Sequence, residues 1–151
     1  MKVTSSAFSE GTMIPKEFTC DDINISPPLE WSQVPEGTKT FAVICDDPDA
    51  PSGTWVHWIL YNLPSGITQL YENLSPVESL SNGAKQGKND FGRTGYRGPC
   101  PPGGTHRYYF RVYALAKELY VKAGITKAEL LKAMEGSILA EGELMGRYKR
   151  N

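Results

Sequence analysis

Short strand-like runs, separated by spacers rich in proline and glycine, limit most strongly what this chain can fold into. The longest runs are short, rich in β-branched or aromatic residues and bounded by turn formers, as is typical of β-strands; they are Thr38–Cys45, Val56–Leu63 and Tyr108–Leu115. Shorter candidates lie near Val3–Phe8 and Ile67–Tyr71. Because the spacers are too short and too rich in proline and glycine for crossover helices, a parallel α/β sheet is not expected.

Helix is expected only near the end of the chain. Thr126 and Glu129 form a capping box, in which each side chain satisfies a backbone N–H at the start of a helix. A set of apolar residues then follows at helical spacing: Leu131, Met134, Ile138, Met145 and Tyr148. Three glycines in this stretch weaken a helix, which would therefore need to pack on the sheet. A short helix is also expected around Ala116–Ala123. The predicted fold class is mainly β, with C-terminal helices.

Length and charge exclude several classes of protein. A chain of 151 residues fits a single domain, 1–151. Its 16 basic and 17 acidic residues give a net charge of −1, which argues against nucleic acid or an anionic membrane surface as the main partner. No apolar stretch is long enough for a transmembrane segment or a signal peptide, so a cytoplasmic location is expected.

The three cysteines fit that location. In a reducing cytosol Cys20, Cys45 and Cys100 are expected to be mostly free thiols, and their spacing matches no zinc motif. Cys45 lies inside a hydrophobic strand and is expected in the core. Because Cys20 and Cys100 both lie in loops, a disulfide or redox role for them stays an alternative.

One loop and two histidines are the features most suggestive of a binding site. The segment 82–105 has 24 residues and holds seven of the 15 glycines, and loops of this length in compact domains usually bind something. His106 follows this loop, and His57 follows a second turn-rich run, Asp47–Gly53. Two histidines that each open a strand beside such a loop would converge on one pocket if those strand ends lie together.

Several motifs carry a family resemblance. They are Asp47-Pro48-Asp49-Ala50-Pro51, Trp55-x-His57-Trp58, Gly98-Pro99-Cys100-Pro101-Pro102 and His106-Arg107-Tyr108, supported by Ser26–Trp31 and Asn89-Asp90-Phe91-Gly92. In these motifs and their order the chain resembles the phosphatidylethanolamine-binding protein (PEBP) family, which includes the Raf kinase inhibitor proteins, and most of all its shorter prokaryotic branch. The resemblance implies a β-sandwich of mostly antiparallel strands with a small surface pocket for phosphate and phosphoryl headgroups.

The resemblance also implies which residues form the pocket. Its lining would be Asp47, His57, Gly98, His106 and Tyr108, with Trp55 and Pro101 as walls. Imidazole N–H groups, a tyrosine hydroxyl and loop amides can all donate to phosphate oxygens. Asp47 would repel phosphate, so it is expected to orient an imidazole or to meet an ammonium group of the ligand. Two departures from longer members are that no pocket tyrosine precedes Trp55 and that Cys100 stands where many members have glycine.

Plainer interpretations stay open for these residues. Asp47-Pro48-Asp49 could simply be a β-turn capped by its own side chain, and His57 and His106 could be hydrogen-bonded structural histidines. Catalysis would need a nucleophile held by a histidine–acid pair, for which Ser52 and Cys100 are candidates. His57, His106 and an aspartate could also imitate a metal triad.

The function expected from the sequence is binding. The ligand would be a phosphorylated small molecule or a phospholipid headgroup, without catalytic residues, metal or cofactor. The alternative, implied by the family resemblance, is direct inhibition of a kinase or serine protease. A homodimer is also expected by analogy with prokaryotic relatives.

Overall fold

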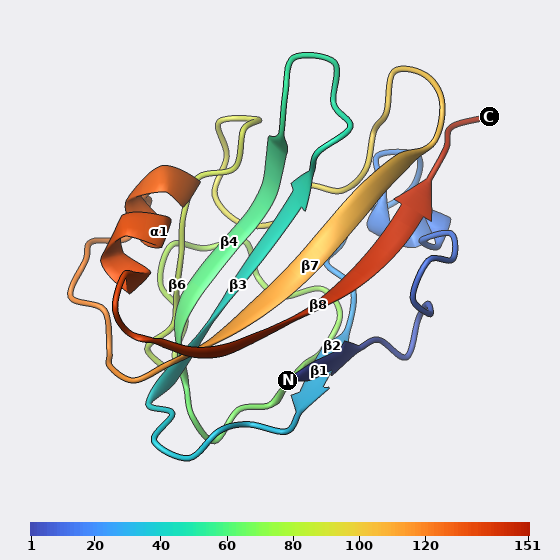
Figure 1. The fold of residues 1–151 in the computed structure, drawn as a ribbon. Coiled ribbons are helices and arrows are strands. Elements are labelled where there is room, and N and C mark those ends of the chain that lie inside the picture. Colours follow the sequence, from blue (N-terminus) through green and yellow to red (C-terminus); the bar gives the residue numbers. More distant parts are fainter.

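The computed structural model describes all residues, 1–151, and the fold is built mainly from strands (Figure 1). Its elements are β1 (Lys2–Thr4), the 3₁₀ turn η1 (Lys16–Phe18), β2 (Leu29–Ser32), β3 (Thr40–Asp47), β4 (Trp55–Pro64), β5 (Gln69–Leu70), β6 (Lys85–Gln86), β7 (His106–Leu115), α1 (Lys127–Met134) and β8 (Ile138–Tyr148). No helix is long and apolar enough to cross a bilayer. The mainly β fold class is confirmed, and the long expected runs correspond to β3, β4 and β7.

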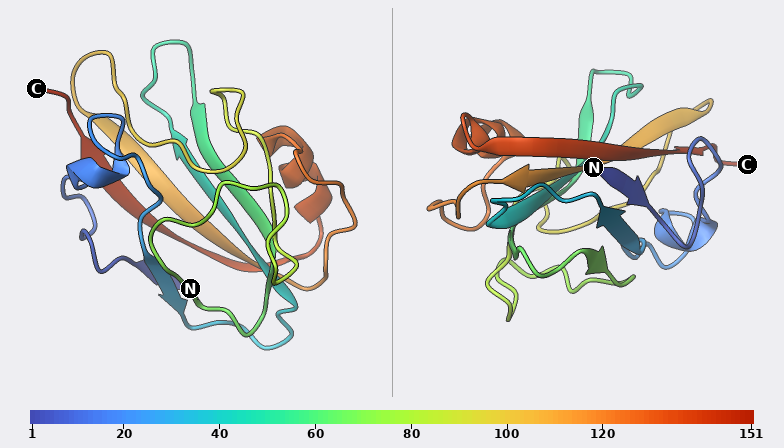
Figure 2. Two further views of the ribbon diagram at one scale, coloured as in Figure 1. Left: turned by 180° about the vertical axis from the view of Figure 1, so that it is seen from behind. Right: turned by 60° about the horizontal axis from the view of Figure 1, so that its bottom comes forward.

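The strands form two antiparallel sheets. The larger has five strands in the order β6-β4-β3-β7-β8, and the smaller has three in the order β1-β2-β5. The long central strands pair over most of their length, from Thr40↔Leu115 to Asp46↔Tyr109 between β3 and β7. Figure 2 shows the smaller sheet on one face of the larger one.

Two apolar clusters cover the two faces of the larger sheet. One contains 21 buried residues and joins the two sheets, for example through Trp31 of β2 and Phe41 of β3. The other contains 11 residues and packs α1 and the chain before it on the opposite face, where Leu130 and Met134 are fully buried. Trp58, from the Trp55-x-His57-Trp58 motif, is fully buried in the first cluster.

The predicted C-terminal helix begins where expected but ends early, and the second predicted helix is absent. Thr126 and Glu129 form the expected capping box at the start of α1. The helix ends at Met134, however, and residues 138–148 form the edge strand β8 instead of continuing the helix. Gly136 adopts a φ of 79°, a left-handed conformation that stops a helix. The segment 116–123, expected as a short helix, contains no helical turn.

The two loops beside the histidines come together at one end of the larger sheet. Strand β3 ends at Asp47, and β4 and β7 begin at Trp55 and His106. Because both β4 and β7 pair antiparallel to β3, all three of these positions lie at the same end. In Figure 1 the turn between β3 and β4 and the loop before β7 project from that end. The topology thus brings His57 and His106 together, as the sequence suggested.

Candidate functional site

A cavity of about 340 Å³ opens between these two loops. Its lining is Asp47, Ala50, Pro51, Ser52, Trp55, His57, Phe91, Cys100, Pro101, Pro102, His106 and Tyr108. We call it the histidine pocket. Its walls are mostly aromatic rings and prolines, and the polar groups are few. Such apolar walls strengthen each polar contact that a bound ligand makes.

His106 is held by a carboxylate at the base of the pocket. Its Nδ1 lies 2.7 Å from Oδ2 of Asp47, and both side chains are more than nine-tenths buried. The other oxygen of Asp47 accepts the backbone N–H of Asp49 at 2.7 Å. Asp47 therefore caps the turn and orients the imidazole at once, while its role in ligand binding stays a prediction.

His57 is held by a backbone carbonyl on the other side of the pocket. Its Nδ1 lies 2.5 Å from the carbonyl oxygen of Arg97, and since a carbonyl can only accept, Nδ1 carries the proton. Burial lowers the pKa of His57, and the hydrogen bond to Arg97 opposes this only in part. His57 is therefore neutral near pH 7, with the lone pair of Nε2 unused.

Both Nε2 atoms are available to a ligand. Although both histidines are buried overall, neither Nε2 makes a hydrogen bond and neither is fully enclosed. Both Nε2 atoms are therefore accessible from the pocket that the two side chains line. Rings support them from the sides: Tyr108 lies 5.3 Å from His57 and 6.4 Å from His106 between centroids. Burial, with the nearby Asp47 carboxylate, raises the pKa of Tyr108, so its phenol stays protonated.

Six of the seven predicted pocket residues line this cavity. They are Asp47, Trp55, His57, Pro101, His106 and Tyr108. The expectation for Gly98 is wrong. Its amide already donates to Oδ1 of Asn24 at 2.7 Å, and an added Cβ would lie 2.0 Å from the carbonyl oxygen of Phe18. Gly98 lets two backbone segments pack closely behind the pocket and offers no donor to a ligand.

Phe91 is the pocket residue that sequence reasoning missed. It lies 5.5 Å from Trp55 and 5.4 Å from His57 between ring centroids, and forms one side of the opening. The motif Asn89-Asp90-Phe91-Gly92 was noted, but nothing in it shows where the ring points. The fold around it does: Asp90 accepts the N–H of Val56 and Asn89 caps the turn, which together place Phe91 over β4.

An ion pair joins the two loops that flank the pocket. Asp49 accepts the backbone N–H of Arg107 and two hydrogen bonds from its guanidinium group. These hydrogen bonds lower the pKa of Asp49 to about 2. The pair joins the turn after β3 to the start of β7, so the two loops of the pocket are tied directly to each other.

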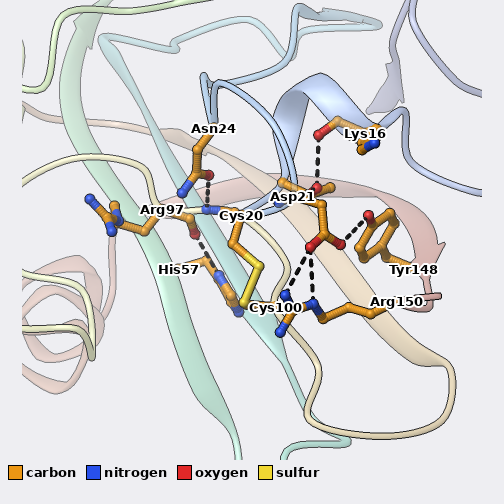
Figure 3. The surroundings of a disulfide bond; sticks show 11 residues. Lys16, Cys20, Asp21, Asn24, His57, Arg97, Cys100, Tyr148 and Arg150 are labelled. Atoms are coloured by element: carbon orange, nitrogen blue, oxygen red, sulfur yellow. Dashed lines mark hydrogen bonds and ion pairs between the residues drawn. A yellow bond between two sulfur atoms is a disulfide. The ribbon is translucent and has the colours of Figure 1, made fainter.

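A disulfide forms part of the pocket wall (Figure 3). Cys20 and Cys100 are bonded across 80 residues, which corrects the expectation of free thiols at these two positions. The bond ties the segment after η1 to the proline-rich loop, and the N–H of Cys20 also donates to the carbonyl of Pro99. Cys45 is a free, fully buried cysteine, as expected.

Neither candidate nucleophile, Ser52 or Cys100, is hydrogen-bonded to a histidine. Cys100 has no thiol in this state, because its sulfur is bonded to Cys20. Ser52 is exposed on the rim and makes no hydrogen bond to either histidine. Likewise, no group of three or more histidine, cysteine, aspartate or glutamate side chains is arranged to hold a metal ion.

Comparison with known proteins identifies the family. The family model described as phosphatidylethanolamine-binding protein matches residues 4–149, nearly the whole chain. The chain belongs to the phosphatidylethanolamine-binding protein family. Among PEBP-family relatives, a UPF0098 protein of Methanothermobacter thermautotrophicus is 50% identical over 150 residues and covers 99% of both chains. A UPF0098 protein of Aquifex aeolicus is 49% identical and covers all of this chain and 90% of its own.

Solved structures confirm the PEBP fold. A putative PEBP homolog from Chlamydia trachomatis superposes with a TM-score of 0.91 at 44% identity, covering 99% of this chain and 97% of its own. YbcL of E. coli, described as a new member of the mammalian PEBP family, gives a TM-score of 0.90 at 36% identity over 99% and 98% of the two chains. These relatives place the chain in the prokaryotic branch of the PEBP family.

Proposed function

We propose that the histidine pocket binds a phosphoryl group, and that this PEBP-family protein acts by binding without turning the ligand over. The observation that carries the proposal is the pair of buried imidazoles in one cavity, each held at Nδ1 by a fixed acceptor. Fixing Nδ1 directs Nε2 of each ring toward the ligand, so neither ring needs to reorganise on binding.

The two histidines would meet the phosphoryl group in different ways. His106, whose Nδ1 is held by the Asp47 carboxylate, presents Nε2 to the ligand, and it would donate from Nε2 to a phosphate oxygen when both ring nitrogens carry protons. Neutral His57 offers the lone pair of Nε2, which can accept from the P–OH of a phosphate monoanion or take up a proton when a dianion binds. The pocket is therefore suited to a phosphoryl group as either its monoanion or its dianion.

The rest of the pocket favours a ligand with an amine or an apolar group next to the phosphate. Trp55 and Phe91 form an edge-to-face pair at the opening, and aromatic faces attract ammonium groups. A phosphorylated amine such as a phosphoethanolamine headgroup combines both features. Regulation of a kinase or protease by direct contact, and a homodimer, stay predictions from the family resemblance.

Isothermal titration calorimetry with O-phosphorylethanolamine, inorganic phosphate and ethanolamine tests the proposal. The first two ligands should bind and ethanolamine alone should not. His106→Asn, which keeps a donor toward Asp47, should weaken binding about 10- to 100-fold, the range for a lost hydrogen bond to a charged group. The matched control is Lys39→Gln, because Lys39 is exposed and precedes β3 at the end of the strand opposite Asp47.

Two results would contradict the proposal. One is an unchanged affinity in a folded His106→Asn variant, which would move the binding site elsewhere. The other is release of inorganic phosphate from O-phosphorylethanolamine at a rate that depends on the protein concentration, which would show turnover.

The cytoplasmic location expected from the sequence stays a prediction. The Cys20–Cys100 disulfide removes one of its supports, because disulfides are typical of oxidising compartments and occur inside cells mainly in hyperthermophiles. Fractionation of the producing cells, with the protein alkylated at lysis to preserve its thiol state, would locate the protein and report the state of both cysteines there.

A further inference from the structure

The structure contains a second cavity, which is larger and more polar than the histidine pocket. It has a volume of about 540 Å³ and is lined by Asn24, Pro76, Gly92, Arg93, Thr94, Tyr96 and Arg97. Arg97 lines this cavity and also contacts His57 of the histidine pocket. Its carbonyl oxygen holds His57, and Figure 3 shows its side chain extending away from His57.

The two arginines of this cavity differ from the others in the chain. The chain has six arginines. Arg107, Arg111 and Arg150 pair with aspartates, and Arg147 donates to the carbonyl of Gly11. The guanidinium groups of Arg93 and Arg97 have no hydrogen-bond or ion-pair partner, and no aspartate or glutamate lines the cavity. Two positive charges thus share one concave surface without a counter-charge.

Neutral donors complete the surface. Asn24 accepts the N–H of Gly98 through Oδ1, which fixes the amide and leaves both Nδ2 protons available. The hydroxyl of Thr94 has no partner either, and it lines the same cavity. Guanidinium groups bind oxyanions through two parallel N–H bonds, and two of them balance the charge of a phosphate dianion.

We propose that the cavity formed around Arg93 and Arg97 is a second anion site, separate from the histidine pocket, that binds a phosphate dianion or a phosphate monoester. It does not depend on the histidine pocket, because the two cavities share no lining residue.

Titration of the full chain with inorganic phosphate, followed by ¹H–¹⁵N NMR at constant ionic strength, tests this second site. The Nε–Hε signals of Arg93 and Arg97 and the Nδ2 signals of Asn24 should shift together and saturate with one dissociation constant. Arg93→Gln should weaken that constant at least fivefold, measured at Arg97 and Asn24, whereas the exposed-lysine control Lys39→Gln should change it less than twofold.

Shifts that grow linearly without saturation would overturn the second site, as would equal effects of Arg93→Gln and Lys39→Gln. Acetate producing saturable shifts of the same size would overturn the choice of phosphate as the ligand. The indole N–H of Trp55 reports the histidine pocket in the same spectra. If Trp55 stays unchanged while the arginine signals saturate, the proposed function fails and the second site stands; the opposite pattern rejects the second site alone.

Discussion

Nδ1 of His106 lies 2.7 Å from Oδ2 of Asp47, at the point where strands β3 and β7 open into the histidine pocket. The same carboxylate caps the turn that begins at Asp47, through the N–H of Asp49. One side chain thereby couples the shape of the loop to the direction of the imidazole. The affinity of a ligand that contacts His106 therefore depends on the conformation of this turn, even if the ligand does not contact the turn itself.

Replacing the carboxylate should cost both stability and binding. Asp47→Ala leaves Nδ1 of buried His106 and the N–H of Asp49 without their acceptor, and we expect the free energy of unfolding to fall by about 1.5–3 kcal/mol. Urea denaturation measures this change. Asp22→Ala is the matched control, because Asp22 is exposed and its side chain makes no hydrogen bond or ion pair. Equal losses in the two variants would show that the Asp47–His106 contact contributes nothing to stability.

The buried His57 predicts a loss of stability in mild acid. Its pKa is lowered by burial in the folded protein, so the unfolded chain binds a proton first as the pH falls below about 6.5. The free energy of unfolding should therefore decrease from about pH 7 to about pH 5, by up to about 1.4 kcal/mol per pH unit from this group. His57→Asn keeps a donor toward Arg97 and should flatten this part of the curve. Parallel curves for the variant and the wild type would contradict the prediction.

Gly98 should tolerate no side chain. An added Cβ would lie 2.0 Å from the carbonyl oxygen of Phe18, so Gly98→Ala must move one of two packed backbone segments. We expect the free energy of unfolding to fall by about 1–3 kcal/mol or more. Gly103→Ala, in the same loop, meets no atom within 4 Å and serves as control. A Gly98→Ala variant as stable as Gly103→Ala would show that the close approach to Phe18 does not exist in solution.

Reduction of the disulfide should destabilise the protein. The bond closes a long loop, since its cysteines are 80 residues apart, and such crosslinks are typically worth about 2–4 kcal/mol. We expect a dithiol reductant to lower the melting temperature of the wild type and the Cys20→Ser/Cys100→Ser variant to melt at the reduced value. The reductant should have no effect on the double variant. Unchanged melting of the wild type, after mass spectrometry has confirmed reduction, would contradict this.

The strands could be predicted where alternating apolar residues are bounded by turn residues. The last strand, β8, could not. Leu131, Met134, Ile138, Met145 and Tyr148 fit helical spacing, yet Ile138 lies in β8 with 44% of its surface exposed. The glycines of this stretch are better explained by close packing in a strand than by a helix. Gly142 and Gly146 lie where a Cβ would collide with the carbonyl of Met1 and with the side chain of Ile14, so this strand packs tightly on the N-terminal segment. That contact is non-local and leaves no periodic pattern in the sequence.

The meeting of His57 and His106 could be predicted because both open strands beside conspicuous loops. The other pocket residues were implied by the family resemblance. The Cys20–Cys100 bond could not be derived from spacing, since it depends on where η1 packs. Phe91 and Gly98 were misjudged for a related reason: the direction of a loop side chain and the partner of a loop amide are set by contacts such as Val56–Asp90 and Asn24–Gly98. Those contacts exist only in the folded chain.

The most direct test of the phosphoryl-binding pocket is to observe the ring nitrogens of its two histidines. Long-range ¹H–¹⁵N NMR spectra of the ¹⁵N-labelled protein, titrated with O-phosphorylethanolamine, resolve Nδ1 and Nε2 of each ring. We predict that Nε2 of both His57 and His106 shifts and saturates with one dissociation constant, equal to the calorimetric value, while each Nδ1 stays protonated. Nε2 signals that remain unchanged while the ligand binds would contradict the account, because the phosphoryl group would then lie outside the histidine pocket.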